Sequence, residues 1–181
     1  MWLSQSNVAY PINKDRLIVA IGFSGVNKSN FIPNLYNTLK ISKNLSITSK
    51  VYTFNYNKES PQVIGVGFQY YQGKNDSLNW VLCFQKADLK GLSDYRLSTI
   101  TLNAFRRLSF RNFEVFYGFG SNFYKRRLYV IYENTFQMKE DQINYLDISL
   151  LTKVSHLNIN INLLSNFENN VISLMFQKNI F

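Results

Sequence analysis

The sequence predicts an all-β protein in which an antiparallel up-and-down meander closes into a barrel of about 10–12 strands, with about 8 as the lower limit. From Leu157 to Leu163, aliphatic residues alternate strictly with asparagines, so a strand here has one aliphatic face and one amide face. The chain also holds 15 Phe and 12 Tyr, residue types that favour strands. No segment has the periodicity of an amphipathic helix, and we therefore expect almost no helical structure.

A short segment precedes the predicted barrel. Residues 1–15 are polar and irregular around Pro11, and the 181-residue chain leaves residues 16–181 as one barrel domain. In the strand expected over residues 16–26, large aliphatic and aromatic residues alternate with Ile18, Ala20, Gly22 and Ser24. Large side chains on one face and mostly small ones on the other are typical of a narrow closed barrel, whose interior has little room.

The next segment is harder to divide. A connection is expected over residues 27–35, which contain Pro33. Between residues 36 and 57 the apolar parity changes, and a bulge or tight turn near Ser49-Lys50 would explain the change.

The rest of the chain divides into regular strands joined by short connections, as a meander of antiparallel hairpins requires. Strands are predicted over residues 62–72, 78–85, 95–108, 113–123, 126–137, 143–154, 157–165 and 171–178.

The distribution of charge favours a membrane barrel over a soluble fold. The apolar parity of the strands carries almost no charge, and the other parity is rich in Gly, Ser, Thr, Asn and Gln. A membrane barrel turns its apolar side chains toward lipid and its polar ones into the lumen, whereas a soluble sandwich exposes Lys and Glu. The alternative left open is a soluble all-β binding or structural subunit of a larger assembly, possible in an organelle.

Two basic clusters are expected at opposite rims of this barrel. Arg106, Arg107 and Arg111 surround one predicted turn, and Lys125, Arg126 and Arg127 occupy the next. Consecutive turns of a meander lie at opposite ends of the strands, so these clusters cannot form the single basic stripe of a nucleic-acid binder. With a net charge of +9, two rims instead suit anionic lipid or lipopolysaccharide head groups.

Charged residues of both signs are also expected inside the lumen. They lie on the polar parity of the predicted strands, where a low dielectric favours pairing between them. The predicted lumenal charge network consists of Glu114, Arg127, Glu133, Asp147 and Lys153.

The sequence contains no pattern of catalytic or metal-ligating residues. His156 is the only histidine and lies at a predicted turn, and Cys83 is the only cysteine. Gly118-Phe119-Gly120 lacks the following helix that a phosphate-binding loop needs, so its glycines are interpreted as a crowded barrel interior. We expect no catalytic, cofactor or metal site, and no enzymatic activity.

Several strands resemble those of bacterial outer-membrane β-barrel proteins as a class. The resemblance is carried by Leu17–Phe23, Ile64–Tyr70, Val115–Gly120 and the terminal strand that ends at Phe181. Such proteins commonly end in a strand with a terminal aromatic residue. The resemblance implies an antiparallel barrel in an outer membrane, with lipid as its surroundings.

From these observations we expect a non-enzymatic outer-membrane barrel with a largely filled lumen and a structural, adhesive or small-solute role. The first residues lack the basic and apolar regions of a secretory signal, so this location presumes that a signal has been removed. Expected partners are the bilayer, anionic lipid or lipopolysaccharide head groups and protein partners in an assembly, whereas nucleic acid is disfavoured.

Overall fold

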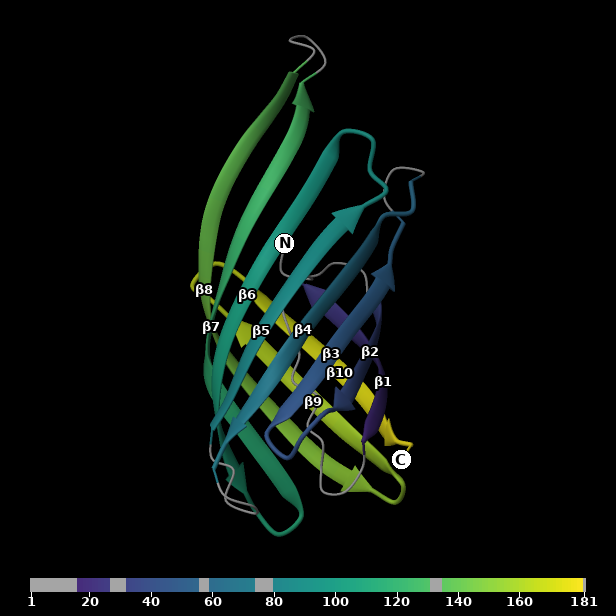
Figure 1. Cartoon of the computed structure of the whole chain (residues 1–181), viewed down its shortest axis with the longest axis vertical. Helices are drawn as coiled ribbons and strands as arrows, with labels where there is room; N and C mark the ends of the chain where they lie inside the picture. Colours follow the sequence, from purple (N-terminus) through teal and green to yellow (C-terminus); the bar gives the residue numbers. More distant parts are fainter. Residues whose placement is uncertain (1–15, 27–31, 56–58, 74–79, 131–134, 181) are drawn as a thin grey trace.

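A computed structural model describes residues 16–26, 32–55, 59–73, 80–130 and 135–180 as ten antiparallel strands closed into one barrel (Figure 1). Each strand pairs with its neighbours in sequence, and β1 pairs with β10 to close the sheet. The strands are β1 (Leu17–Val26), β2 (Ile32–Lys40), β3 (Leu45–Thr53), β4 (Gln62–Gln72), β5 (Trp80–Lys90), β6 (Tyr95–Ser109), β7 (Phe113–Val130), β8 (Thr135–Val154), β9 (Leu157–Ser165) and β10 (Asn170–Asn179). This confirms the all-β meander and sets its strand number at ten for the described residues.

The alternation read from the sequence correctly assigned the two faces of the wall. In β9 the side chains of Asn158, Asn160 and Asn162 are buried inside the barrel, whereas Ile161 and Leu163 are exposed on its outside. The first strand follows the same rule, because Ala20 and Ser24 are buried and Ile21 and Phe23 are exposed. The aliphatic stripes therefore cover the outer surface of the barrel rather than an internal core.

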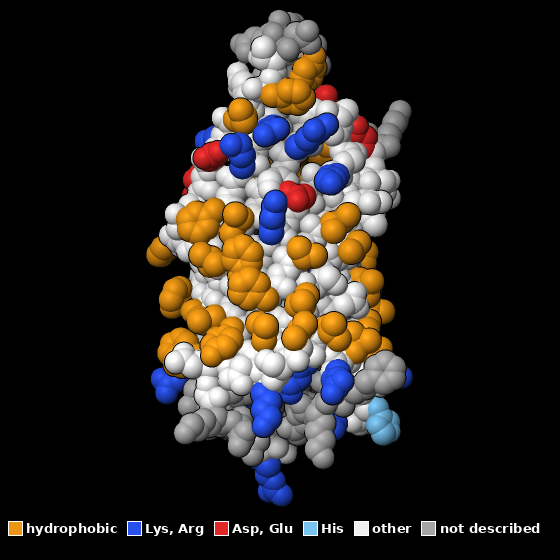
Figure 2. All heavy atoms as spheres, in the orientation of Figure 1, with side chains coloured by type: hydrophobic (Ala, Val, Ile, Leu, Met, Phe, Trp, Pro, Cys, Tyr) orange, Lys and Arg blue, Asp and Glu red, His pale blue; other side chains and the backbone are white. Residues whose placement is uncertain are grey.

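The exposed apolar side chains form a belt around the middle of the barrel, seen as an orange band in Figure 2. Lys and Arg side chains lie above and below this band on the face shown. Members of the belt come from every strand, including Ile21, Leu39, Ile47, Phe68, Leu82, Leu102, Phe119, Ile148, Ile161 and Leu174. No described helix is long and apolar enough to cross a bilayer.

The two ends of the barrel differ in shape. The first is called the terminal end, because the described chain begins and finishes there. The Ile180 amide donates to the Leu17 carbonyl at this end, at 3.0 Å. The other is the projecting end, because β7 and β8 extend beyond their neighbours in a long ribbon (upper left in Figure 1). This projecting hairpin consists of residues 121–130 of β7 and 135–145 of β8; its two strands stay paired up to Val130 and Thr135, and β7 remains paired with β6 as far as Leu128.

The projecting hairpin corrects one predicted boundary. Lys125, Arg126 and Arg127 were expected at a turn between strands 113–123 and 126–137, but they lie within β7 and pair with Glu140, Lys139 and Met138 of β8. Closely spaced basic residues resemble a solvated turn in sequence. Here they lie on strands outside the belt, where water solvates charge on a paired strand equally well.

Two further predictions were wrong in the first third of the chain. The turn between β2 and β3 lies at residues 41–44 rather than near Ser49-Lys50, and the β3–β4 register runs without a bulge from Leu45 to Thr53. The parity change came from Tyr52, an aromatic residue that faces the lumen instead of the belt. Pro33 lies within β2 opposite Phe23, not in a connection.

Glycines allow the wall to pack closely around a filled interior. A β-carbon placed on Gly118 would lie 2.0 Å from the Ala104 carbonyl oxygen, and one on Gly67 would lie 2.2 Å from that of Phe84. Both contacts are with backbone of the neighbouring strand, which cannot move away as a side chain can. The interpretation of Gly118 and Gly120 as residues of a crowded interior is thereby confirmed.

Candidate functional site

The lumen is filled by side chains rather than left as a channel. The middle of the lumen is polar, and most of the polar side chains there have less than a tenth of their surface exposed. The buried polar residues include Asn34, Thr38, Ser46, Lys50, Gln69, Gln85, Thr101, Asn103, Asn122, Asp147, Asn160, Asn162 and Gln177.

Asp147 is the most deeply placed acidic group, with 0% of its surface exposed. The Asn162 side-chain amide on β9 donates hydrogen bonds to the Asp147 carboxylate and, at 2.7 Å, to the Ser149 hydroxyl on β8. Nearby, the Tyr145 hydroxyl donates to the Asn103 side-chain oxygen at 2.5 Å, which links β8 to β6 over Gly120 of the intervening β7. These bonds satisfy groups that would otherwise lie buried without partners.

Lys50 is the buried cation of the same layer. Its ammonium lies 5.7 Å from the ring centroids of both Tyr36, opposite it on β2, and Tyr52, two residues along β3. Aromatic faces attract a cation electrostatically, and the attraction is stronger where water is excluded. Lys50 was not predicted to face the lumen, because the turn expected at Ser49-Lys50 removed it from the inward parity.

Apolar clusters cross the lumen near both of its ends. The cluster toward the terminal end consists of Tyr71, Val81, Cys83, Phe105, Phe116 and Leu151. The cluster toward the projecting end consists of Tyr52, Val63, Ala87, Leu89, Leu97 and Tyr124. The polar middle layer therefore lies between two apolar plugs, as expected of a narrow barrel whose interior is occupied by side chains.

The structure brings together only part of the predicted lumenal charge network. Glu114 and Asp147 face inward as expected, but they are bound separately, Asp147 by Asn162 and Glu114 by an ion pair with Arg107. Arg107 had been assigned to a rim, and its pairing with Glu114 depends on the β6–β7 register, which the sequence alone does not reveal.

The other three members do not join a network in the described structure. Lys153 is on the inward parity but exposed near the terminal end of β8. Arg127 is exposed and shares the outward parity of Phe119 and Phe123, because β7 continues without the turn that would have reversed it. Glu133 lies outside the described residues.

The two rims carry different charge. Among the described residues, the terminal end has a single acid, Glu114, which is paired with Arg107. Its cations are Arg16, Lys40, Lys43, Arg106, Arg107, Arg111, Lys153 and Lys178. The projecting half instead mixes both signs, with Lys86, Lys90, Arg96, Lys125, Arg126, Arg127 and Lys139 beside Glu59, Asp88, Asp94, Glu140, Asp141 and Glu168.

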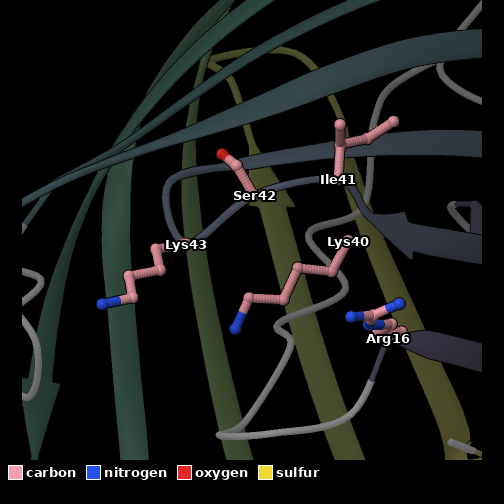
Figure 3. Close-up of a pocket in the computed structure, with 5 residues that line it drawn as sticks. All are labelled: Arg16, Lys40, Ile41, Ser42 and Lys43. Carbon is pink, nitrogen blue, oxygen red and sulfur yellow. The ribbon is translucent and has the colours of Figure 1, made fainter.

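A pocket of about 310 Å³ lies within the terminal rim (Figure 3). It is lined by Arg16 at the start of β1 and by Lys40, Ile41, Ser42 and Lys43 at the β2–β3 turn. The Lys40 amide donates to the Arg16 carbonyl at 2.7 Å, which holds the two segments together. Three cationic side chains around one pocket favour an anion with several oxygens.

The projecting hairpin is braced by side-chain contacts between its two strands. Lys125 forms an ion pair with Glu140 at 2.6 Å, and the Tyr124 hydroxyl donates to Asp141 at 3.0 Å. The hydrogen bond from Lys125 lowers the pKa of the Glu140 carboxyl. The backbone amide of Gln142, and after it the Tyr124 hydroxyl, lower the pKa of the Asp141 carboxyl.

The described residues contain no group of three or more His, Cys, Asp and Glu side chains that could hold a metal ion. His156 is exposed at the β8–β9 turn, and Cys83 is buried within the apolar cluster of the terminal end.

No protein-family model matches the chain, and a search of curated proteins finds no match. Similar solved structures come from the class that the sequence resembles. Ail, the attachment invasion locus protein of Yersinia pestis, in complex with sucrose octasulfate, is 8% identical, with 90% of this chain and 94% of that chain covered and a TM-score of 0.38. Omp33 of Acinetobacter baumannii is 9% identical over 92% and 98% of the two chains, with a TM-score of 0.46. The KdgM porin is 9% identical over 90% and 100%, with a TM-score of 0.43.

Proposed function

We propose that this protein is a non-enzymatic outer-membrane barrel with a filled lumen and a structural or adhesive role. The observation that carries the proposal is the belt of exposed apolar side chains around a polar, packed interior. In water such a belt would be costly, whereas in a bilayer its side chains contact lipid chains and closure of the sheet satisfies the backbone hydrogen bonds. The belt disfavours the alternative of a soluble subunit.

The shape of the two ends suggests an orientation. Membrane barrels of this class keep short turns on the periplasmic side and longer segments outside. The turns at the terminal end include residues 41–44 and 110–112, whereas the other end extends into the projecting hairpin. In our proposal the cationic terminal end faces the periplasm, and the projecting hairpin stands outside the cell.

A filled lumen predicts that the protein does not conduct ions as a porin does. In a planar bilayer we expect no large, stable conductance steps, because two apolar clusters and a packed polar layer occupy the interior. A sixteen-stranded porin in the same bilayer serves as the positive control. Steps of comparable size from this protein would contradict a structural or adhesive role and favour transport.

The pocket of the terminal rim supports binding of anionic lipid head groups. Lys and Arg at a membrane surface each contribute about 1 kcal/mol toward an anionic leaflet, or about fivefold in affinity. We therefore expect the combined replacement of Arg16, Lys40 and Lys43 by glutamine to weaken binding of phosphatidylglycerol in nanodiscs by about a hundredfold. Native mass spectrometry or lipid titration measures the change.

The matched control replaces three cations of the projecting half by glutamine, namely Lys86, Lys90 and Arg96. This variant removes the same formal charge from the other rim, so it should leave the terminal pocket intact. Equal loss of lipid binding in both variants would show that net charge alone governs the interaction, and the pocket would then have no special part in it.

A further inference from the structure

A row of three cations crosses the outer wall between the apolar belt and the projecting end. Arg96 of β6 lies directly opposite Arg127 of β7, and both side chains are exposed on the outward face. Lys90, the last residue of β5, lies beside Arg96, because the preceding Leu89 pairs with Leu97. We call these three residues the cation row. On the face shown in Figure 2, Lys and Arg side chains gather in this region above the orange band.

The charge of the row is not neutralised within the wall. Like charges directly opposite each other destabilise a sheet, and the ion pairs of the described residues include no member of the row. Of the two acids nearby on the outward face, Glu140 is paired with Lys125 at 2.6 Å. The other, Asp88, lies between Lys86 and Lys90 on β5, so it offsets one of these two lysines. The two facing arginines therefore offer a position where a bound anion would relieve their repulsion.

The top of the apolar belt lies directly below the two arginines on the same strands. Ile100 of β6 pairs with Phe123 of β7, and both side chains are exposed on the outside. They lie four residues along their strands from Arg96 and Arg127, which is about 13 Å, or about 10 Å of height on strands tilted by about 40°. When the hydrocarbon core of a bilayer covers the belt, the arginines therefore lie at the level of the head groups.

We propose that the cation row binds the phosphates of an outer-leaflet glycolipid that carries two of them, as the lipid A part of lipopolysaccharide does. Guanidinium groups bind phosphate oxygens through pairs of parallel hydrogen bonds. Neighbouring strands lie about 4.8 Å apart, so the row is about 10 Å long and can hold two phosphates side by side. A phospholipid with a single phosphate would engage only part of it. The site rests on the proposed function, which turns the projecting end toward the outer leaflet.

Uncharged polar side chains beside the row suit the sugars of such a lipid. Gln62 of β4 lies opposite Lys90 and is exposed on the same outward face. Ser98 lies on β6 between Arg96 and Ile100, also on the outward parity. Amide and hydroxyl groups both donate and accept hydrogen bonds, as sugar hydroxyls require. The cation row, these polar neighbours and the apolar pair below them thus match the phosphates, sugars and acyl chains of one amphiphile.

The test uses the full chain folded in detergent micelles and titrated separately with diphosphoryl lipid A, monophosphoryl lipid A and phosphatidylglycerol. Native mass spectrometry measures how much of each lipid is bound. Each cation at a membrane surface contributes about fivefold in affinity for an anionic lipid. We therefore expect the wild-type protein to bind diphosphoryl lipid A about fivefold or more tightly than either lipid with one phosphate.

The double variant Arg96→Gln/Arg127→Gln should weaken binding of diphosphoryl lipid A by about 25-fold, because it removes two cations of the row. The matched control is Arg126→Gln/Lys139→Gln. These two residues also lie opposite each other, on β7 and β8, but on the inward parity. The control removes the same charge from another pair of facing cations in the same hairpin, and it should leave lipid A binding unchanged. Both variants keep the terminal pocket, so lipid bound there contributes equally to each measurement.

Equal weakening in the two double variants would mean that net charge alone attracts the lipid, and the cation row would then be no binding site. Equal affinity of the wild-type protein for diphosphoryl lipid A and phosphatidylglycerol would likewise overturn the assignment to a glycolipid with two phosphates. Insertion of the barrel into lipid vesicles is scored separately. A chain that does not insert contradicts the proposed function, whereas one that inserts without preferring diphosphoryl lipid A contradicts only the site.

Discussion

Replacing Asn162 with leucine is expected to lower the free energy of unfolding by about 2–5 kcal/mol. The Asn162 amide donates a hydrogen bond to Asp147, whose surface is 0% exposed, and leucine offers no hydrogen bond in its place. The Ser149 hydroxyl loses the same donor. Urea titration of the protein folded into lipid vesicles measures the change, with tryptophan fluorescence as the signal.

The double variant Asp147→Leu/Asn162→Leu separates pairing from packing. Replacing both partners of a buried hydrogen bond by apolar groups costs much less than removing one of them. We therefore expect the double variant to be more stable than Asn162→Leu alone. Additive losses would instead mean that the two side chains contribute independently, and the lumenal bond would have no role in holding β8 to β9.

The face that a residue occupies was predictable from sequence wherever the strand bounds were right, because a strand repeats every two residues and a barrel wall has only two sides. The asparagines of β9 face the lumen and Ile161 faces outward, as the alternation alone indicates. The composition of the interior was predictable too, because the residues of the inward parity are polar and mostly uncharged in the sequence itself.

Strand ends and side-chain partners were less predictable, because both depend on register and on where the membrane stops. The basic residues at Lys125 resembled a turn, although a strand can continue into water beyond the belt without any change in its pattern. The pairs Arg107–Glu114 and Asp147–Asn162 form between adjacent strands, and a shift of two residues in register would separate their members. The inward position of Lys50 was not predicted, because a turn was wrongly expected at Ser49-Lys50.

Replacing Ile161 with arginine is expected to cost about 2–4 kcal/mol when the barrel is folded in a bilayer, because the charge would lie at the lipid-facing middle of the belt. Ile161 is 46% exposed on the outside of β9, so the structure offers it no protein partner to neutralise an arginine. Gln142→Arg is the matched control, since that side chain points outward on β8 above the belt, where the cost should be at most about 1 kcal/mol.

Stability alone does not separate lipid contact from a protein contact at this position, but chemical labelling does. In a Cys83→Ala background, Ile161→Cys should react with a lipid-phase thiol probe and resist a water-soluble one. Gln142→Cys should show the reverse preference. Exposure of the Ile161 side chain in the isolated barrel means that only surrounding material can protect it. Protection of position 161 from both probes would indicate a protein interface over the belt, and the membrane location would then be wrong for this face.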